Sequence, residues 1–150
     1  MLPDTRFFGL KRTLLRICGA KIEDGVRICS SATFIGTGDL FIGKDTWIGH
    51  QVFISSSSSV TIGESVDIAP RVYIGTGTHE IDPNGKHVAG RGVNKDIAIG
   101  NGAWLCANSV ILPGVSIGNK SIVAAGAVVN KSCGHNELIA GVPAKFIKKV

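Results

Sequence analysis

The sequence predicts an all-β fold in which short strands wind into triangular coils that stack into a prism. An aliphatic residue recurs every six positions, as in the successive blocks IGKDTW, IGHQVF and ISSSSS of residues 42–59. Aromatic residues make up only 6% of the chain, and 20 glycines are scattered along it. These proportions suit a core of small, regular aliphatic layers, so the repeat is expected to organise the fold.

The six-residue period excludes two simpler structures. An aliphatic residue at every sixth position does not stay on one face of an α-helix, and it does not give the alternation of a half-buried strand. The pattern is satisfied when each block forms one short strand with a corner and three blocks close one turn. Five isoleucines would then share a column with separations of 20, 20, 37 and 18 residues, which predicts about five coils over residues 22–134. The column consists of Ile22, Ile42, Ile62, Ile99 and Ile117.

Residues 4–18, which precede the repeats, are expected to form a short helix. Asp4 or Thr5 is placed to cap its N-terminus. An apolar stripe opposite a basic face would make this helix a lid over the open strand edges of the first coil. The stripe comprises Phe7, Phe8, Leu14, Leu15 and Cys18, and the basic face comprises Arg6, Lys11, Arg12 and Arg16. Weak contact with a membrane surface is an alternative role for the basic face.

One turn of the predicted coil is too long. The 37 residues between Ile62 and Ile99 exceed the 18 to 20 of the other turns, so residues 79–96 are expected to leave the stack as an extended loop. Long ordered loops on rigid scaffolds are commonly functional, although a disordered surface insertion is the alternative. The serines at 55–59, in contrast, keep the register of the repeat and are expected to stay in the coil.

Length, charge and cysteine spacing limit the classes of function. The 150 residues are expected to form one domain, with residues 135–150 as a C-terminal segment after the coils. No apolar run reaches the roughly 18 residues that cross a bilayer, and no signal peptide is recognisable, so a cytoplasmic protein is expected. The net charge of +5 comes without a nucleic-acid-binding motif and suits an anionic small molecule equally well. The four cysteines lack paired spacing and are expected to be reduced thiols.

The chain resembles the hexapeptide-repeat acyltransferases over residues 22–147. The most specific shared features are the repeats, the stretch GTGTHEIDP at 75–83 and the ending VVNK…IAGVPAKFI. Within this family the chain is most similar to the sugar O-acetyltransferases of polysaccharide and colanic-acid type. The resemblance implies a left-handed parallel β-helix, which departs from the usual right-handed crossover. It also implies a homotrimer whose active sites lie between subunits.

The resemblance further implies a general base and a mechanism. A histidine alone is more often structural, but His79 matches the family histidine that acts as the base, and an imidazole is largely neutral at cytoplasmic pH. It would take the proton of an acceptor hydroxyl as that oxygen attacks the thioester of acetyl-CoA, with a backbone N–H stabilising the oxyanion and without a metal. Cys29, Cys106 and Cys133 occupy small packing positions, so no acyl-enzyme is expected.

Other residues are assigned to binding by their match to the family. The residues expected to contact acetyl-CoA are Trp104, Ala107, Ala125, Asn130, Lys131 and Lys145. The residues expected near the acceptor are Gln51, Ser56, Glu80 and Asp82. The sequence departs from the family pattern in two places, because Asn130 stands where threonine is usual and an acidic residue common near Ser56 is absent. Other interpretations stay open. Trp104 could merely cover the outer wall, and Glu80 and Asp82 could orient His79 or be solvated loop charges.

The sequence leaves alternatives to sugar O-acetylation. Serine or another small hydroxyl compound could be the acceptor. A metal enzyme on the same coil would need three convergent histidines, and the four histidines lack that spacing; they are His50, His79, His87 and His135. A binding scaffold that has lost activity is the third alternative, which the intact THE and NK positions disfavour.

Overall fold

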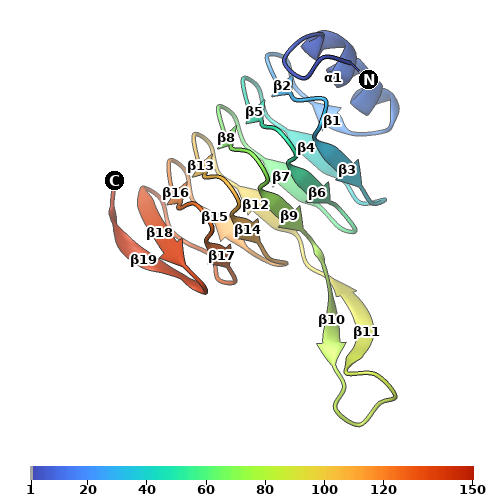
Figure 1. Cartoon of the computed structure of the whole chain (residues 1–150), viewed down its shortest axis with the longest axis vertical. Coiled ribbons are helices and arrows are strands. Elements are labelled where there is room, and N and C mark those ends of the chain that lie inside the picture. Colours follow the sequence, from blue (N-terminus) through green and yellow to red (C-terminus); the bar gives the residue numbers. More distant parts are fainter. Residues whose placement is uncertain (1) are drawn as a thin grey trace.

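The protein is a parallel β-helix with a helix at one end and a hairpin projecting from its side (Figure 1). The computed structural model describes residues 2–150. Three parallel sheets form the walls of a triangular tube, and each coil contributes one strand to each wall, which confirms the predicted coil of three six-residue blocks. Two of the walls have five strands, in agreement with the expected number of coils.

Each wall collects strands that lie about one coil apart in sequence. Sheet A consists of β1 (Lys21–Ile22), β4 (Leu40–Ile42), β7 (Val60–Ile62), β12 (Ile97–Ile99) and β15 (Ser116–Ile117). Sheet B consists of β2 (Arg27–Ile28), β5 (Trp47–Ile48), β8 (Asp67–Ile68), β13 (Trp104–Leu105), β16 (Ile122–Val123), β18 (Glu137–Gly141) and β19 (Ala144–Lys149). Sheet C consists of β3 (Thr33–Ile35), β6 (Phe53–Ser55), β9 (Tyr73–Gly75), β14 (Val110–Ile111) and β17 (Val128–Val129).

The isoleucine column is in register through sheet A. Ile22 pairs with Ile42, Ile42 with Ile62, and Ile62 with Ile99, which in turn pairs with Ile117. All five side chains are at most 4% exposed. Stacking identical aliphatic side chains in each coil fills the narrow tube with few aromatic residues, as the repeat predicts.

Truncating the column in its centre is expected to destabilise the fold strongly. Ile62 is fully buried between Ile42 and Ile99, so Ile62→Ala leaves a cavity that flat walls cannot close. We expect the free energy of unfolding to fall by about 2–5 kcal/mol, measured by denaturant titration. Thr61→Ala, on the exposed face of the same strand, is the control and should change stability by about 0.5 kcal/mol or less. Equal effects of the two substitutions would contradict this packing.

The N-terminal helix α1 (Phe8–Ile17) covers the first coil as expected, but its inner face is mixed: Phe8 and Leu15 of the predicted stripe pack inward together with the basic residue Lys11. Lys11 is buried against the coil, while Phe7, Leu14 and Cys18 of the predicted stripe are exposed. The predicted N-cap was also wrong: the helix begins after Phe7, with no side-chain cap, and Asp4 accepts a hydrogen bond from the Ser31 backbone instead.

Unpaired carbonyls of the first coil explain why basic residues lie on the inner face of the helix. β1 and β2 are edge strands, and edge strands expose backbone groups that need partners. Lys11 donates to the carbonyl of Ile28 at 2.9 Å, and Arg12 and Arg16 donate to two further carbonyls, those of Val26 and Ile22. The side chains of Lys11, Arg12 and Arg16 therefore close the end of the tube beside Leu15, while apolar residues such as Leu10, Leu14 and Ile17 are exposed.

Two antiparallel hairpins depart from the coil pattern. The first, which we call the arm, spans residues 77–94 and consists of β10 (Gly77–Ile81) and β11 (Ala89–Asn94). It projects from the tube between β9 and β12 (Figure 1), close to the predicted limits of 79–96. The second is formed by β18 and β19, and β18 extends sheet B next to β16. No helix within residues 2–150 is long and apolar enough to cross a bilayer.

Candidate active site

The predicted site residues fall on two different corners of the tube. We call the turns from sheet B to sheet C the B–C corner and the turns from sheet C to sheet A the C–A corner. The arm leaves at the C–A corner, because it lies between β9 of sheet C and β12 of sheet A. Sheet C separates the two corners, so residues on different corners of one chain lie on opposite sides of that wall.

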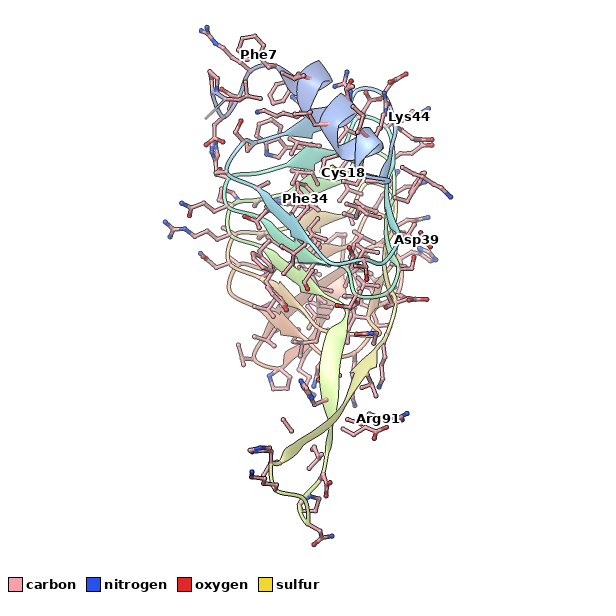
Figure 2. The ribbon with its side chains drawn as sticks, turned by 90° about the vertical axis from the view of Figure 1, so that its right-hand side faces the viewer. Phe7, Cys18, Phe34, Asp39, Lys44 and Arg91 are labelled. Atoms are coloured by element: carbon pink, nitrogen blue, oxygen red, sulfur yellow. The ribbon has the colours of Figure 1, made fainter. Side chains whose placement is uncertain are left out.

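His79 lies on the arm and is oriented by the backbone of the opposite strand. Its side chain is exposed on β10, and its Nδ1 lies 2.9 Å from the carbonyl oxygen of Gly90. A carbonyl can only accept, so Nδ1 carries the proton in this bond. In the neutral ring Nε2 is then left with a free lone pair that can accept a proton. Figure 2 shows the arm extending clear of the tube, with Arg91 on it.

The two carboxylates beside His79 in sequence form other contacts. Glu80 pairs with Arg91, whose Nε lies 3.3 Å from the carboxylate, and this hydrogen bond raises the pKa of Arg91. Asp82 accepts a hydrogen bond from the backbone N–H of Asn84 at the start of the tip. Their hydrogen bonds go to Arg91 and Asn84, and the group that orients His79 in this chain is a carbonyl. The carbonyl that does so, that of Gly90, has no side-chain signature and could not be identified before the strands were paired.

Thr76 fixes the root of the arm to the serine turn. Its hydroxyl oxygen is buried and accepts hydrogen bonds from the backbone N–H groups of Ser57 and Ser58 at 2.8 and 3.1 Å. On the other side of the root, Asp96 accepts from the N–H of Ser59, and this bond holds the pKa of Asp96 below its usual value. The serine run is thus part of the coil, as its register predicts.

Removing the Thr76 hydroxyl is expected to loosen this root. Thr76→Val keeps the shape but leaves two partly buried N–H groups without their acceptor, so we expect a loss of about 1 kcal/mol of unfolding free energy. Hydrogen exchange at Ser57 and Ser58 should accelerate with it. Thr78→Val, on the exposed part of β10, is the control and should do neither. Unchanged exchange in Thr76→Val would contradict the role of this hydroxyl.

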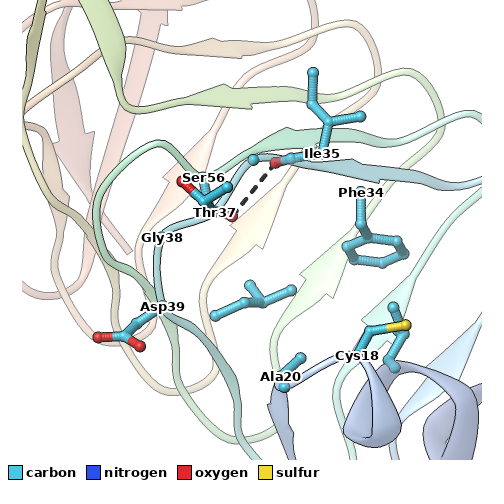
Figure 3. A pocket seen from close by; sticks show the side chains of 12 residues that line it. Cys18, Ala20, Phe34, Ile35, Thr37, Gly38, Asp39 and Ser56 are labelled. Carbon is cyan, nitrogen blue, oxygen red and sulfur yellow. Dashed lines mark hydrogen bonds between the residues drawn. The ribbon is translucent and has the colours of Figure 1, made fainter.

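A pocket of about 320 Å³ opens at the C–A corner near the helix end of the tube. Ser56 lines it, and Figure 3 shows Thr37, Gly38 and Asp39 of the preceding coil on the same wall of the pocket. Asp39 adds a carboxylate to the lining of the same pocket as Ser56, although the acidic residue of the family pattern is absent from the serine run. The two residues come from adjacent coils, which stack at this corner: the N–H of Val60 donates to the carbonyl of Asp39, and the N–H of Ser56 donates to that of Ile35.

Gln51 lies on the other side of sheet C from Ser56. It occupies the B–C corner with a left-handed backbone (φ 56°), and its side-chain oxygen accepts from the Nε of Arg71 at 2.8 Å. β6 separates it from Ser56, which is at the C–A corner. Within one chain the two predicted acceptor residues are therefore not brought together.

The residues expected to hold acetyl-CoA also divide between the corners. Ala107 and Ala125 lie in successive coils at the B–C corner, where the N–H of Gly126 donates to the carbonyl of Ala107 at 3.0 Å. Asn130 and Lys131 are exposed at the C–A corner after β17. Trp104 is 50% exposed on sheet B and Lys145 is exposed on β19. Neither corner alone carries His79 together with the small residues expected along the cofactor.

The cysteines have the properties of structural thiols. Cys29 is buried, and Cys106 and Cys133 are partly buried, while Cys18 at the helix end is exposed. Burial raises the pKa of Cys29, Cys106 and Cys133. A raised pKa keeps these groups as thiols at neutral pH and lowers their reactivity, which supports transfer without an acyl-cysteine.

Within residues 2–150 of a single chain, no three histidines meet in a group that could hold a metal ion. Among residues 2–150, one group of side chains could hold a metal ion, and it contains a single histidine, His50, with Asp4 and Cys29. His79 is not part of it. This arrangement lacks the three-histidine site that the metal-enzyme alternative requires.

Comparison with known proteins supports the fold and the class. The sequence profile "Bacterial transferase hexapeptide (six repeats)" matches residues 96–131. An Escherichia coli protein named for O-acetyl transfer in lipopolysaccharide biosynthesis is 36% identical over 139 residues, which cover 87% of this chain and 70% of that protein. A Saccharomyces cerevisiae protein named as an acetyltransferase is 36% identical over 112 residues, 75% of this chain. The chain spans only 57% of the length of the yeast protein.

A solved structure extends the likeness to three dimensions. A galactoside acetyltransferase in complex with coenzyme A superposes with a TM-score of 0.81 at 29% identity, covering 94% of this chain and 70% of that one. The match confirms the left-handed parallel β-helix that the family resemblance implies. Fold, repeat and relatives thus define a β-helical transferase. The chain belongs to the hexapeptide-repeat acyltransferases.

Proposed function

We propose that the protein is an acetyl-CoA-dependent O-acetyltransferase that acts on a hydroxyl of a sugar or polysaccharide precursor. The observation that carries this proposal is the His79 imidazole, held through Nδ1 by Gly90 with Nε2 free, on an arm that projects from the coil. The names of the relatives favour sugar hydroxyls as acceptors and coenzyme A as the acyl carrier. Serine or another small hydroxyl compound is the second candidate, since the same chemistry would serve it.

The reaction proceeds by direct transfer in this proposal. Nε2 of His79 takes the hydroxyl proton while the acceptor oxygen attacks the carbonyl carbon of the thioester. A backbone N–H stabilises the oxyanion, and the intermediate collapses to the acetyl ester with loss of the CoA thiolate. The Gly90 carbonyl stabilises the imidazolium that forms, because it accepts the Nδ1 proton throughout. The raised pKa values of the Cys106 and Cys133 thiols support transfer without an acyl-enzyme.

We place the complete site between two chains of a homotrimer. His79 at the C–A corner of one chain would then meet Ala107 and Ala125 at the B–C corner of its neighbour, which joins the two halves that sheet C separates within a chain. The outer face of sheet C supports this assembly because its in-register column is uncharged. The column consists of Thr33, Phe53, Tyr73, Val110 and Val128.

The pocket at Ser56 is proposed as the acceptor site. Hydroxyl and carboxylate groups bind sugar hydroxyls well, and Thr37, Asp39 and Ser56 offer both around about 320 Å³. Glu80 and Asp82 on the arm are proposed to reach the acceptor from the same chain as His79, and Gln51 to line the neighbour's side of the site. Trp104 is proposed to lie beside the acyl end of acetyl-CoA. Asn130, Lys131 and Lys145 are proposed to bind its CoA part, the two lysines through the phosphates.

A cytoplasmic location is part of the proposal. The four cysteines of the protein are unpaired, as is usual in a reducing compartment, and acetyl-CoA is expected there. Contact of the helix with a membrane surface stays a prediction.

An acceptor screen tests the proposal. Acetyl-CoA would be incubated with sugars, nucleotide sugars, lipid-linked glycans and serine, with release of free thiol followed in each case. We expect thiol release that depends on one acceptor class, and a product heavier by one acetyl group in mass spectrometry. Acetylation of serine alone would favour the second candidate. CoA binding without turnover on any acceptor would overturn the catalytic proposal and favour a binding scaffold.

A further inference from the structure

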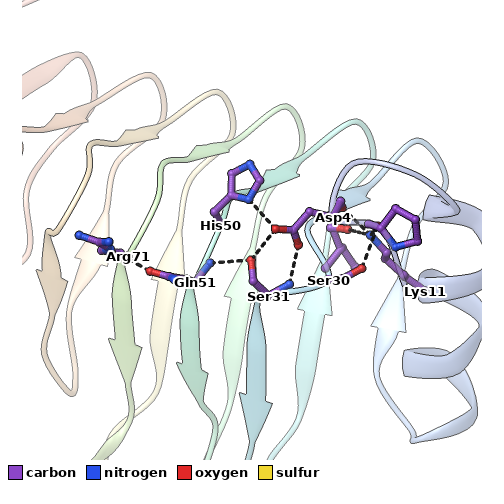
Figure 4. Close-up of polar contacts among 9 residues, drawn as sticks. Asp4, Lys11, Ser30, Ser31, His50, Gln51 and Arg71 are labelled. Carbon is purple, nitrogen blue, oxygen red and sulfur yellow. Dashed lines mark hydrogen bonds and ion pairs between the residues drawn. The ribbon is translucent and has the colours of Figure 1, made fainter. Parts of the chain in front are cut away.

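Three side chains with metal-binding atoms meet near the helix end of the tube, away from the arm. Asp4 comes from the segment before α1, Cys29 from the end of β2 and His50 from the same corner of the next coil. Figure 4 shows Asp4 placed between His50 and Ser31. One ligand atom from each of Asp4, Cys29 and His50 lies within 4.8 Å of the other two.

The repeat holds two of these ligands in fixed positions. The N–H of Cys29 donates to the carbonyl of Ile48 at 2.9 Å, so Cys29 and His50 stand in adjacent coils at the B–C corner. Asp4 is anchored independently, because the N–H and the hydroxyl of Ser31 donate to its carboxylate at 2.7 and 3.1 Å. His50 Nδ1 lies 2.8 Å from Asp4 Oδ2, and this bond lowers the pKa of Asp4. The three ligands are thus preorganised by contacts that do not depend on a metal.

We propose that Asp4, Cys29 and His50 form a structural site for Zn²⁺. Thiolate, imidazole and carboxylate are the ligands that zinc prefers, and tetrahedral zinc places such atoms about 3.3–3.6 Å apart. Each pair in the cluster already lies within 4.8 Å, so closure needs a shift of about 1 Å, smaller than many side-chain rotations provide. The hydroxyl of Ser31 or a water molecule completes the fourth position.

Charge and proton balance are compatible with a dication. Zn²⁺ with one thiolate, one carboxylate and a neutral imidazole is electrically neutral, so the Lys11 ammonium, which donates to the carbonyls of Asp4 and Ile28, faces no excess positive charge. Burial raises the pKa of Cys29, so the metal must displace the thiol proton, which is released to solvent. The imidazole nitrogen that binds zinc gives up its hydrogen bond to Asp4.

The metal would fasten the N-terminal segment to the first two coils. Asp4 precedes the helix that closes the tube, so a bond from Asp4 to both coils holds this lid in place. The proposed role is structural, because the three ligands join the N-terminal segment to the first two coils and none of them is proposed to act on acetyl-CoA or the acceptor. Sequence inspection missed the site because its ligands are 25 and 21 residues apart and become neighbours only when the coils stack.

Metal titration of untagged protein tests the proposal. After treatment with a chelator, Co²⁺ should add a thiolate-to-cobalt charge-transfer band that saturates at one equivalent, and Zn²⁺ should displace it. Zn²⁺ should also raise the thermal midpoint. Both effects should vanish in Cys29→Ser, His50→Ala and Asp4→Asn, whose folding is checked by circular dichroism. Cys106→Ser and His87→Ala are the matched controls and should bind like the original protein.

Two results would overturn the proposal. Absence of the charge-transfer band at one equivalent would show that Cys29 does not bind metal. A band that persists in folded His50→Ala and Asp4→Asn would place the metal elsewhere. His50→Ala removes a partly exposed side chain, so its folding does not depend on the buried thiol, and it keeps the test decisive if Cys29→Ser fails to fold.

Discussion

Replacing His79 with alanine is expected to lower kcat by about 100- to 10,000-fold, the usual contribution of a general base. The KM for acetyl-CoA should change little, since the imidazole acts on the acceptor proton and is not among the residues proposed to hold the cofactor. Fold and oligomeric state should also be unchanged, because the side chain is exposed and bonds only to Gly90. Steady-state thiol release with the acceptor found by the screen measures the effect.

His87→Ala is the matched control for this substitution. His87 lies on the same arm, beyond β10 and outside the strand pairing, and it is exposed like His79. Its removal should leave kcat within a factor of about two, as expected for a surface substitution away from the reacting atoms. Turnover by His79→Ala at the original rate would refute the proposed base, whatever acceptor the enzyme uses.

Placing a charge on the outer face of sheet C is expected to dissociate the proposed trimer. Tyr73 stands at the middle of the uncharged column and stacks on Phe53 with ring centroids 5.8 Å apart. In an assembly that buries this face, Tyr73→Glu would bury an unpaired carboxylate, which proteins strongly disfavour. Light scattering should therefore show single chains, and activity should fall with the loss of the intersubunit site.

The control for this experiment lies on a different wall. Thr61 is exposed at the centre of sheet A, so Thr61→Glu adds the same charge to a face that is not proposed as an interface. It should keep both the trimer and the activity. If the trimer survives Tyr73→Glu but not Thr61→Glu, the interface lies on sheet A and the assignment to sheet C is wrong.

The coil was predictable from sequence because its cause is local and repeated. Every sixth residue must enter a narrow tube, so the isoleucine column and the excess length between Ile62 and Ile99 are visible in the letters alone. The serine run was assigned to the coil for the same reason, and the buried Thr76 hydroxyl explains how its backbone is satisfied.

The N-terminal helix shows where local periodicity is insufficient. Apolar and basic residues alternate along it in a pattern that predicts an apolar inner face. The tube end, however, presents unpaired carbonyls that apolar side chains cannot satisfy, and Lys11, Arg12 and Arg16 can. This demand arises only after the coils stack, so it is absent from the helix sequence.

The site was predictable in its residue types but less so in its geometry. The match of GTGTHEID to the family made His79 the candidate base, and the group that orients it is a backbone carbonyl on the opposite strand of the arm. Asp39 became recognisable only when its coil stacked on that of Ser56 at one pocket. The division of the remaining residues between two corners could not be foreseen, because the six-residue repeat gives every corner a similar sequence.

Mixing two inactive variants tests the intersubunit site most directly. His79→Ala removes the base, and Ala125→Trp fills the exposed corner proposed for acetyl-CoA; each alone should be inactive. When the two are dissociated, mixed in equal amounts and reassembled, about one quarter of the interfaces in a cyclic trimer should combine an intact arm with an intact corner. We therefore predict recovery to about one quarter of the original activity. A mixture that stays as inactive as its parents, although mixed trimers are present, would contradict a site shared between chains.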